Sequence, residues 1–163
     1  MARGLSTQPA PGEAGPPCAL FLYSPVGGDH FHASCALSDA WLKTNQGWSS
    51  EKIDFLQFLP RWERELWLRL YYLSLQYWPS LWRRYRQWTN RRDEPRLTRE
   101  RVVDTGTEAF AEILRTTRPK LIVSTIGGAA ALAGEARAQL AKSQDCSFLN
   151  VLVVSGFRAH HHW

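Results

Sequence analysis

The residue types best suited to chemistry gather in one short stretch, SPVGGDHFHAS, residues 24–34. Its glycines could turn backbone N–H groups toward a phosphate, but the spacing is neither GxGxxG nor GxxxxGKS/T, and Asp29 would repel an anion. Asp29, His30 and His32 could bind a metal together with histidines near the C-terminus, although no HExxH or CxxC pattern accompanies them. A histidine on a glycine turn could instead accept a proton from an attacking hydroxyl group. The alternative to all three is a solvated loop histidine without a chemical role.

The elements that position this stretch alternate along the chain. Apolar runs predict strands over residues 18–24, 52–58, 119–125 and 147–155, and helical spacing or helix-end signals predict helices over residues 31–44, 61–77, 79–89, 105–118 and 127–143. This alternation favours an α/β fold, a Rossmann-like parallel sheet flanked by helices. Ligands of such sheets bind at the carboxyl ends of the strands, and the glycine-histidine stretch follows the first of them.

The histidines all share that edge in the predicted fold. The first strand is followed by His30 and His32, and the last strand is followed by His160, His161 and His162. The topology therefore predicts one ligand edge that draws histidines from both ends of the chain.

The basic charge is concentrated in residues 61–101. This segment has 11 arginines and 5 acidic residues, a net charge of +6, so the rest of the chain sums to −1 within the total of +5. It also holds five of the eight tryptophans, and Leu66, Leu70, Leu73 and Tyr77 recur at helical spacing. Arginine with aromatic side chains suits an anionic bilayer or a nucleic acid, or a core helix whose aromatics pack on the sheet. No recognised RNA motif accompanies the segment, which favours the membrane over nucleic acid.

Length and composition predict one domain in the cytoplasm. At 163 residues we expect a single core, with residues 1–17, rich in Pro, Gly and Ala, as a disordered leader and residues 18–163 as the domain. No run approaches the roughly 18 apolar residues of a membrane-spanning helix. The three cysteines are widely spaced and odd in number, which suggests neither a disulfide framework nor a metal motif.

Four stretches together resemble a known family. GGDHFHASCAL resembles the GGGHxxxAxAL motif that opens the N-terminal domain of the monogalactosyldiacylglycerol synthase and processive diacylglycerol glucosyltransferase family. YYLSLQYWPSLWRRYRQ is similar to the family's Tyr-rich helix, RPKLIVSTIGG to its PDxVISTHP strand, and SGFRAHHHW to its TDFxxHxxW ending. The resemblance covers about residues 19–163 in the right order, including a second strand that ends in an aspartate, Asp54.

The resemblance implies a fold and an activity. The family has the GT-B fold of two Rossmann-like domains, and this chain corresponds to the N-terminal, acceptor-binding half. A hexose would pass from a UDP-sugar, held by a C-terminal domain that the sequence lacks, to diacylglycerol or a related lipid. The N-terminal half would then be inactive alone, without a cofactor, metal or nucleic acid partner, and would lie on the cytoplasmic side at an anionic membrane surface.

The resemblance also assigns residues. The motif histidine, His30, is implied as the base that deprotonates the acceptor hydroxyl. Acceptor-binding positions are implied at Gly27, Gly28, Asp29, Phe157, His160 and Trp163, and the membrane-facing positions are Trp67, Trp78, Trp82, Arg83, Arg84 and Arg86.

The sequence departs from the family pattern at several turns. Asp29 replaces the third motif glycine, Lys120 stands where Asp is usual, Ile126 and Gly127 replace His-Pro, and Gly156 replaces the Asp of TDF. Each change removes a polar group or alters a turn near the expected cleft. The alternative function is therefore a non-catalytic module, derived from this domain, that binds a lipid surface or a protein partner.

Overall fold

The computed structural model is a layered α/β domain. It describes residues 15–26, 28–80, 84, 97–141 and 147–154. The elements in chain order are β1 (Cys18–Tyr23), α1 (Asp29–Thr44), β2 (Ser49–Asp54), the 3₁₀ helix η1 (Phe55–Phe58), α2 (Arg61–Tyr77), α4 (Leu97–Thr117), β3 (Leu121–Ser124), α5 (Gly127–Ala141) and β4 (Leu149–Leu152).

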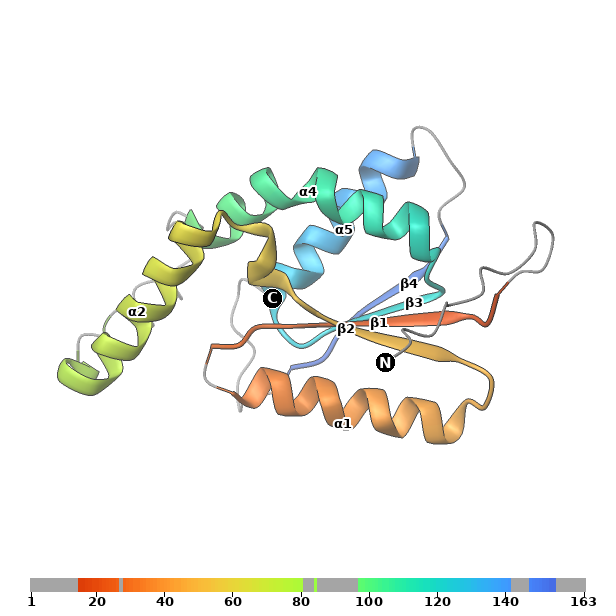
Figure 1. The fold of residues 1–163 in the computed structure, drawn as a ribbon, viewed down its shortest axis with the longest axis horizontal. Helices are drawn as coiled ribbons and strands as arrows, with labels where there is room; N and C mark the ends of the chain where they lie inside the picture. Colours follow the sequence, from red (N-terminus) through yellow and green to blue (C-terminus); the bar gives the residue numbers. More distant parts are fainter. Residues whose placement is uncertain (1–14, 27, 81–83, 85–96, 142–146, 155–163) are drawn as a thin grey trace, which may run out of the picture.

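Within the described residues the strands form one parallel four-stranded sheet in the order β2-β1-β3-β4. Helix α1 covers one face, and α4 and α5 cover the other (Figure 1). The predicted α/β, Rossmann-like class is thereby confirmed. Strands β1, β2 and β3 end at the same edge of the sheet, because Tyr23 pairs with Asp54 and Leu22 pairs with Ser124.

The sheet has two apolar faces because successive side chains of a strand point to opposite sides. Leu20 and Leu22 of β1 belong to the larger buried cluster, which α4 and α5 share. Ala19 and Phe21 belong to the cluster on the α1 side, against which Trp41 packs. One strand thus contributes alternate residues to both cores, which is why CALFLYS is apolar without a break.

Helices α4 and α5 approach the η1 segment closely through glycines. A Cβ atom added at Gly106 of α4 would lie 2.7 Å from the Cβ of Phe58, and one added at Gly128 of α5 would lie 3.2 Å from Cε2 of Phe55. The ring of Phe58 meets that of Phe110 edge-on at 5.6 Å between centroids. Glycine is therefore required sterically at Gly106, where any side chain would push the two segments apart.

Helix α2 departs from this layered arrangement. It extends away from the sheet beyond the end of α4 (Figure 1), and two ion pairs join its first turn to the body. Glu63, which is buried, accepts from Arg101 of α4 at 3.3 Å, and Arg64 donates to Asp54 at 2.6 Å. The rest of the helix leaves large apolar side chains exposed, so the interpretation of residues 61–77 as a core helix is wrong. The predicted apolar face is present, but its four side chains are exposed: Leu66, Leu70, Leu73 and Tyr77.

Some predicted boundaries also change. The strand predicted over residues 52–58 begins at Ser49 and ends at Asp54, because the Asp54 carboxylate accepts the N–H of Leu56 at 2.9 Å and opens η1. Helix α4 begins at Leu97 instead of residue 105. Of the helix predicted over 79–89, residues 79, 80 and 84 are helical and the others lie outside the described part, as do residues 1–14 of the predicted leader. The division into leader and domain stays a prediction.

Candidate functional site

The glycine turn after β1 is built by its own backbone and one buried hydroxyl. Ser24 is buried, and its Oγ accepts the N–H of Val26 at 3.2 Å. Gly28 has φ +78°, in the left-handed region that favours glycine, and it is the N-cap residue of α1. The N–H of His32 donates to the Gly28 carbonyl at 3.0 Å. The turn geometry thus explains Gly28, while Gly27 lies outside the described residues.

His30 is the second residue of α1 and is half-buried. Its carbonyl oxygen accepts a hydrogen bond from Oγ1 of Thr125 at 3.2 Å, which ties the first turn of α1 to the end of β3. Asp29 is exposed in the same turn, where its negative charge interacts favourably with the positive end of the helix dipole. This turn lies at the carboxyl edge of the sheet, as the sequence predicted for His30, Asp29 and His32.

A row of aromatic rings runs along the same turn. Tyr23 at the end of β1 meets Phe31 edge-on at 5.0 Å between centroids, and Phe31 meets the ring of His32 at 5.6 Å. Burial chiefly raises the pKa of Tyr23, the negative charge of Asp54 raises it further, and the positive charge of Arg64 offsets part of this. The phenol is therefore protonated at neutral pH and can donate a hydrogen bond.

The carboxyl end of β2 carries an ion pair. The Asp54 side chain is almost buried and holds both Nη2 of Arg64 and the N–H of Leu56. The Nε of Arg64 is buried and has no hydrogen-bond partner among the described residues. The aspartate found from sequence at the end of the second strand therefore anchors α2 to the edge where His30 lies.

Sequence reasoning missed three side chains of this edge, namely Tyr23, Phe31 and Thr125. The available signal was position, because Tyr23 and Thr125 stand at the ends of predicted strands and Phe31 stands at the start of a predicted helix. Their contacts join residues from different elements, which a linear pattern does not reveal.

Several predicted site residues lie outside the described part of the chain. These are Gly27, Trp82, Arg83, Arg86, Phe157, His160 and Trp163, together with the other C-terminal histidines. Trp67, Trp78 and Arg84 are described and exposed. Within the described ranges, no group of three or more His, Cys, Asp or Glu residues is placed to hold a metal ion. Cys18 and Cys35 are free thiols.

A groove of about 300 Å³ lies elsewhere, between β2 and the second half of α4. Charged and polar side chains such as Glu51, Lys52 and Glu112 line it together with Ile53 and Ile113. None of its lining residues belongs to the glycine turn, so the groove is separate from the candidate site.

None of the described helices is long and apolar enough to cross a bilayer.

A parallel sheet flanked by helices, with a glycine turn and a histidine at its carboxyl edge, defines a Rossmann-like α/β domain. Residues 30–163 match the model of the monogalactosyldiacylglycerol (MGDG) synthase family, and the chain belongs to that family. The predicted membership is confirmed, and the domain corresponds to the N-terminal domain of these glycolipid glycosyltransferases. The match begins at His30, so Gly28 and Asp29 lie just before it. No curated protein and no solved structure matches the chain.

Proposed function

We propose that this domain holds the lipid acceptor of a hexosyltransferase that transfers a sugar from a UDP-sugar to diacylglycerol. The observation that supports it most directly is the family match over residues 30–163, a range that includes His30 at the carboxyl edge of the sheet. The donor sugar would be held by a second domain, so the 163-residue domain is inactive alone.

His30 acts as the general base in this proposal. Its imidazole takes the proton of the acceptor hydroxyl while that oxygen bonds to the anomeric carbon of the sugar. The bond from this carbon to the UDP oxygen breaks, and UDP leaves with the electron pair. Gly28 leaves the turn without a side chain, so substrate can approach the backbone there.

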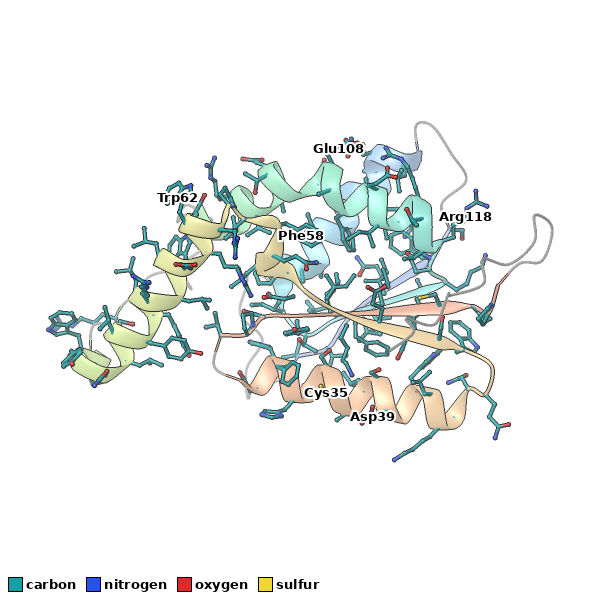
Figure 2. All side chains as sticks on the ribbon, viewed as in Figure 1. Cys35, Asp39, Phe58, Trp62, Glu108 and Arg118 are labelled. Carbon is teal, nitrogen blue, oxygen red and sulfur yellow. The ribbon has the colours of Figure 1, made fainter. Side chains whose placement is uncertain are left out.

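The domain works at the cytoplasmic face of an anionic membrane in the same proposal, where diacylglycerol is dissolved. Helix α2 supports this, because it extends from the body with Trp62 66% and Leu70 51% exposed. Figure 2 shows the side chain of Trp62 at the start of α2, on the far side from the sheet. Trp78 and Arg84 are exposed beyond the helix, within the segment whose net charge is +6. Apolar side chains flanked by arginine suit the interface of an anionic bilayer.

The test joins this chain to the donor domain of a family member and measures hexosyl transfer to diacylglycerol. His30→Ala is expected to reduce turnover by roughly 10²-fold, the usual contribution of a positioned base. His32→Ala is the matched control, since His32 lies on the same turn and is exposed; its turnover should stay near normal. Normal turnover in His30→Ala would remove His30 from this role.

The second candidate function is a non-catalytic module that binds a lipid surface. The replacements at Ile126 and Gly127 favour it, because they follow β3 at the edge where a substrate would bind, whereas Lys120 precedes β3 at the opposite edge. This candidate predicts that the joined protein transfers no sugar while the chain still binds anionic vesicles, whereas an RNA-binding protein would bind RNA instead, with strong salt dependence.

A further inference from the structure

Thr125 occupies a junction of three elements. It follows β3 directly and is 0% exposed. Its N–H donates to the carbonyl of Leu22 in β1 at 3.0 Å. Its Oγ1 lies 3.2 Å from that same carbonyl oxygen and 3.2 Å from the carbonyl oxygen of His30 in α1. A hydroxyl has one hydrogen, so the two carbonyls share it.

The Thr125 hydroxyl supports the first turn of α1, whose N-cap residue has no side chain of its own. Among the described residues no side chain caps the helix, and its N-cap residue is Gly28. An added Cβ at Gly28 would lie 3.9 Å from Cδ2 of His32, an ordinary van der Waals distance. The Thr125 hydroxyl thus holds the backbone of the very residue proposed as the base.

The neighbouring residue shows that burial alone does not create this role. Ser124 is also 0% exposed, yet its Oγ has no hydrogen-bond partner within the described part of the chain. Two buried hydroxyls therefore stand side by side in sequence, and the one on Thr125 reaches His30. Burying a hydroxyl group costs free energy unless the group forms a hydrogen bond. The hydrogen-bonded hydroxyl of Thr125 is therefore the one that links the end of β3 to α1.

From this geometry we infer that Thr125 is a positioning residue for His30. Its hydroxyl fixes the backbone at the start of α1 and thereby sets where the imidazole stands relative to an acceptor hydroxyl. The catalytic half of this inference rests on the proposed function. The structural half, that Thr125 orders the turn of His30, is independent of any reaction.

The structural half is tested on the 163-residue chain with diethyl pyrocarbonate, which modifies accessible imidazoles. Thr125→Val keeps the shape and removes the hydroxyl. It should raise the modification rate of half-buried His30 relative to exposed His32 by about threefold, the change expected when one ordinary hydrogen bond is lost. Thr125→Ser should restore the ratio, and Ser124→Ala should leave it unchanged. An unchanged ratio in a Thr125→Val protein with a normal circular dichroism spectrum overturns the inference.

The catalytic half is tested in the chain joined to a donor domain. Thr125→Val should lower kcat about tenfold with the KM for the UDP-sugar unchanged, because a displaced base affects the chemical step and leaves donor binding intact. Thr125→Ser should recover most of the loss. If His30→Ala abolishes transfer while Thr125→Val does not, the positioning role is wrong and the proposed function stands. If the His30→Ala protein transfers sugar at the normal rate, His30 is not the base. That result does not depend on the modification ratio.

Discussion

The helices α4 and α2 both carry many large apolar side chains, but they use them in opposite ways. Phe110 of α4 is 0% exposed within the core shared with α5, whereas Trp62 of α2 is mostly exposed. In Figure 1 α4 lies along the sheet and α2 extends beyond it. Burial accounts for the apolar residues Val102, Phe110, Ala111 and Leu114 of α4. It does not account for those of α2, whose large apolar side chains are exposed.

The difference originates in small residues and in ion pairs. Helix α4 approaches η1 closely because Gly106 has no side chain, and α5 presents the buried alanines Ala129, Ala133 and Ala136. Helix α2 has no such glycine, and its first turn is held by Glu63 and Arg64. Close packing holds α4 against η1 and α5, while α2 is joined to the body by the ion pairs of its first turn and by Leu68, which packs against the core.

The strongest test of this comparison truncates one apolar side chain in each helix. Phe110→Ala should lower the free energy of unfolding by about 3–5 kcal/mol, because it leaves a cavity beside Phe58 in a close-packed core. Leu73→Ala on α2 should change it by less than about 0.5 kcal/mol, since Leu73 is already exposed. Urea unfolding followed by circular dichroism measures both. Similar losses in the two variants would mean that α2 is packed in solution.

The next test asks whether the exposed side of α2 contacts a bilayer. Trp62, Leu66, Leu70, Leu73 and Tyr77 follow at spacings of three and four residues, which places them in one stripe along the helix. Leu73 is 45% and Leu75 39% exposed, and residues two apart lie about 200° apart around a helix, so they face different sides. They form a matched pair of leucines inside and outside the stripe.

Leu73→Ser should weaken binding to anionic vesicles about tenfold, the effect of losing one partly buried leucine from a membrane interface. Leu75→Ser should change it less than about twofold by the same reasoning. Sedimentation with vesicles of phosphatidylglycerol and phosphatidylcholine gives both partition coefficients. Equal effects would contradict the stripe, and retention that survives Leu73→Ser would transfer the role to Trp67 and Trp78.

Sequence patterns predicted the parts of this fold where local pattern and burial agree. β1 and β3 are buried on both faces, so their apolar runs were clear, and the turn at Gly28 and His30 followed from them. β2 is an edge strand with exposed Glu51 and Lys52, and its pattern was too weak to locate. The apolar run nearby belongs to η1, which explains the error at residues 52–58.

Contacts between distant residues were beyond prediction for a physical reason. Thr125 and His30 are 95 residues apart in the chain, and their hydrogen bond exists because β1 and β3 are neighbours in the sheet. The apolar face of α2 was predicted correctly as a face. Which environment it meets depends on how the chain leaves η1, and no periodicity within the helix encodes that direction.

The smallest expected effect compares a tyrosine of the core edge with one on α2. The pKa of Tyr23 is raised above its ordinary value of about 10, chiefly by burial. The folded state therefore holds this proton more tightly than the unfolded state does. Its contribution to stability is fully present below the ordinary value and is lost as the pH rises through the raised pKa.

Tyr23→Phe cannot ionise and should make the melting temperature fall less between about pH 9 and 11 than in the wild type. Tyr72→Phe, on the exposed side of α2, retains Tyr23. Its melting temperature should therefore fall over this pH range as in the wild type. Thermal unfolding at several pH values measures this difference, with absorbance near 295 nm following tyrosine ionisation. If Tyr23→Phe and Tyr72→Phe change the profile equally, the end of β1 is as open to water as α2, and the contrast between the two regions does not extend to the candidate site.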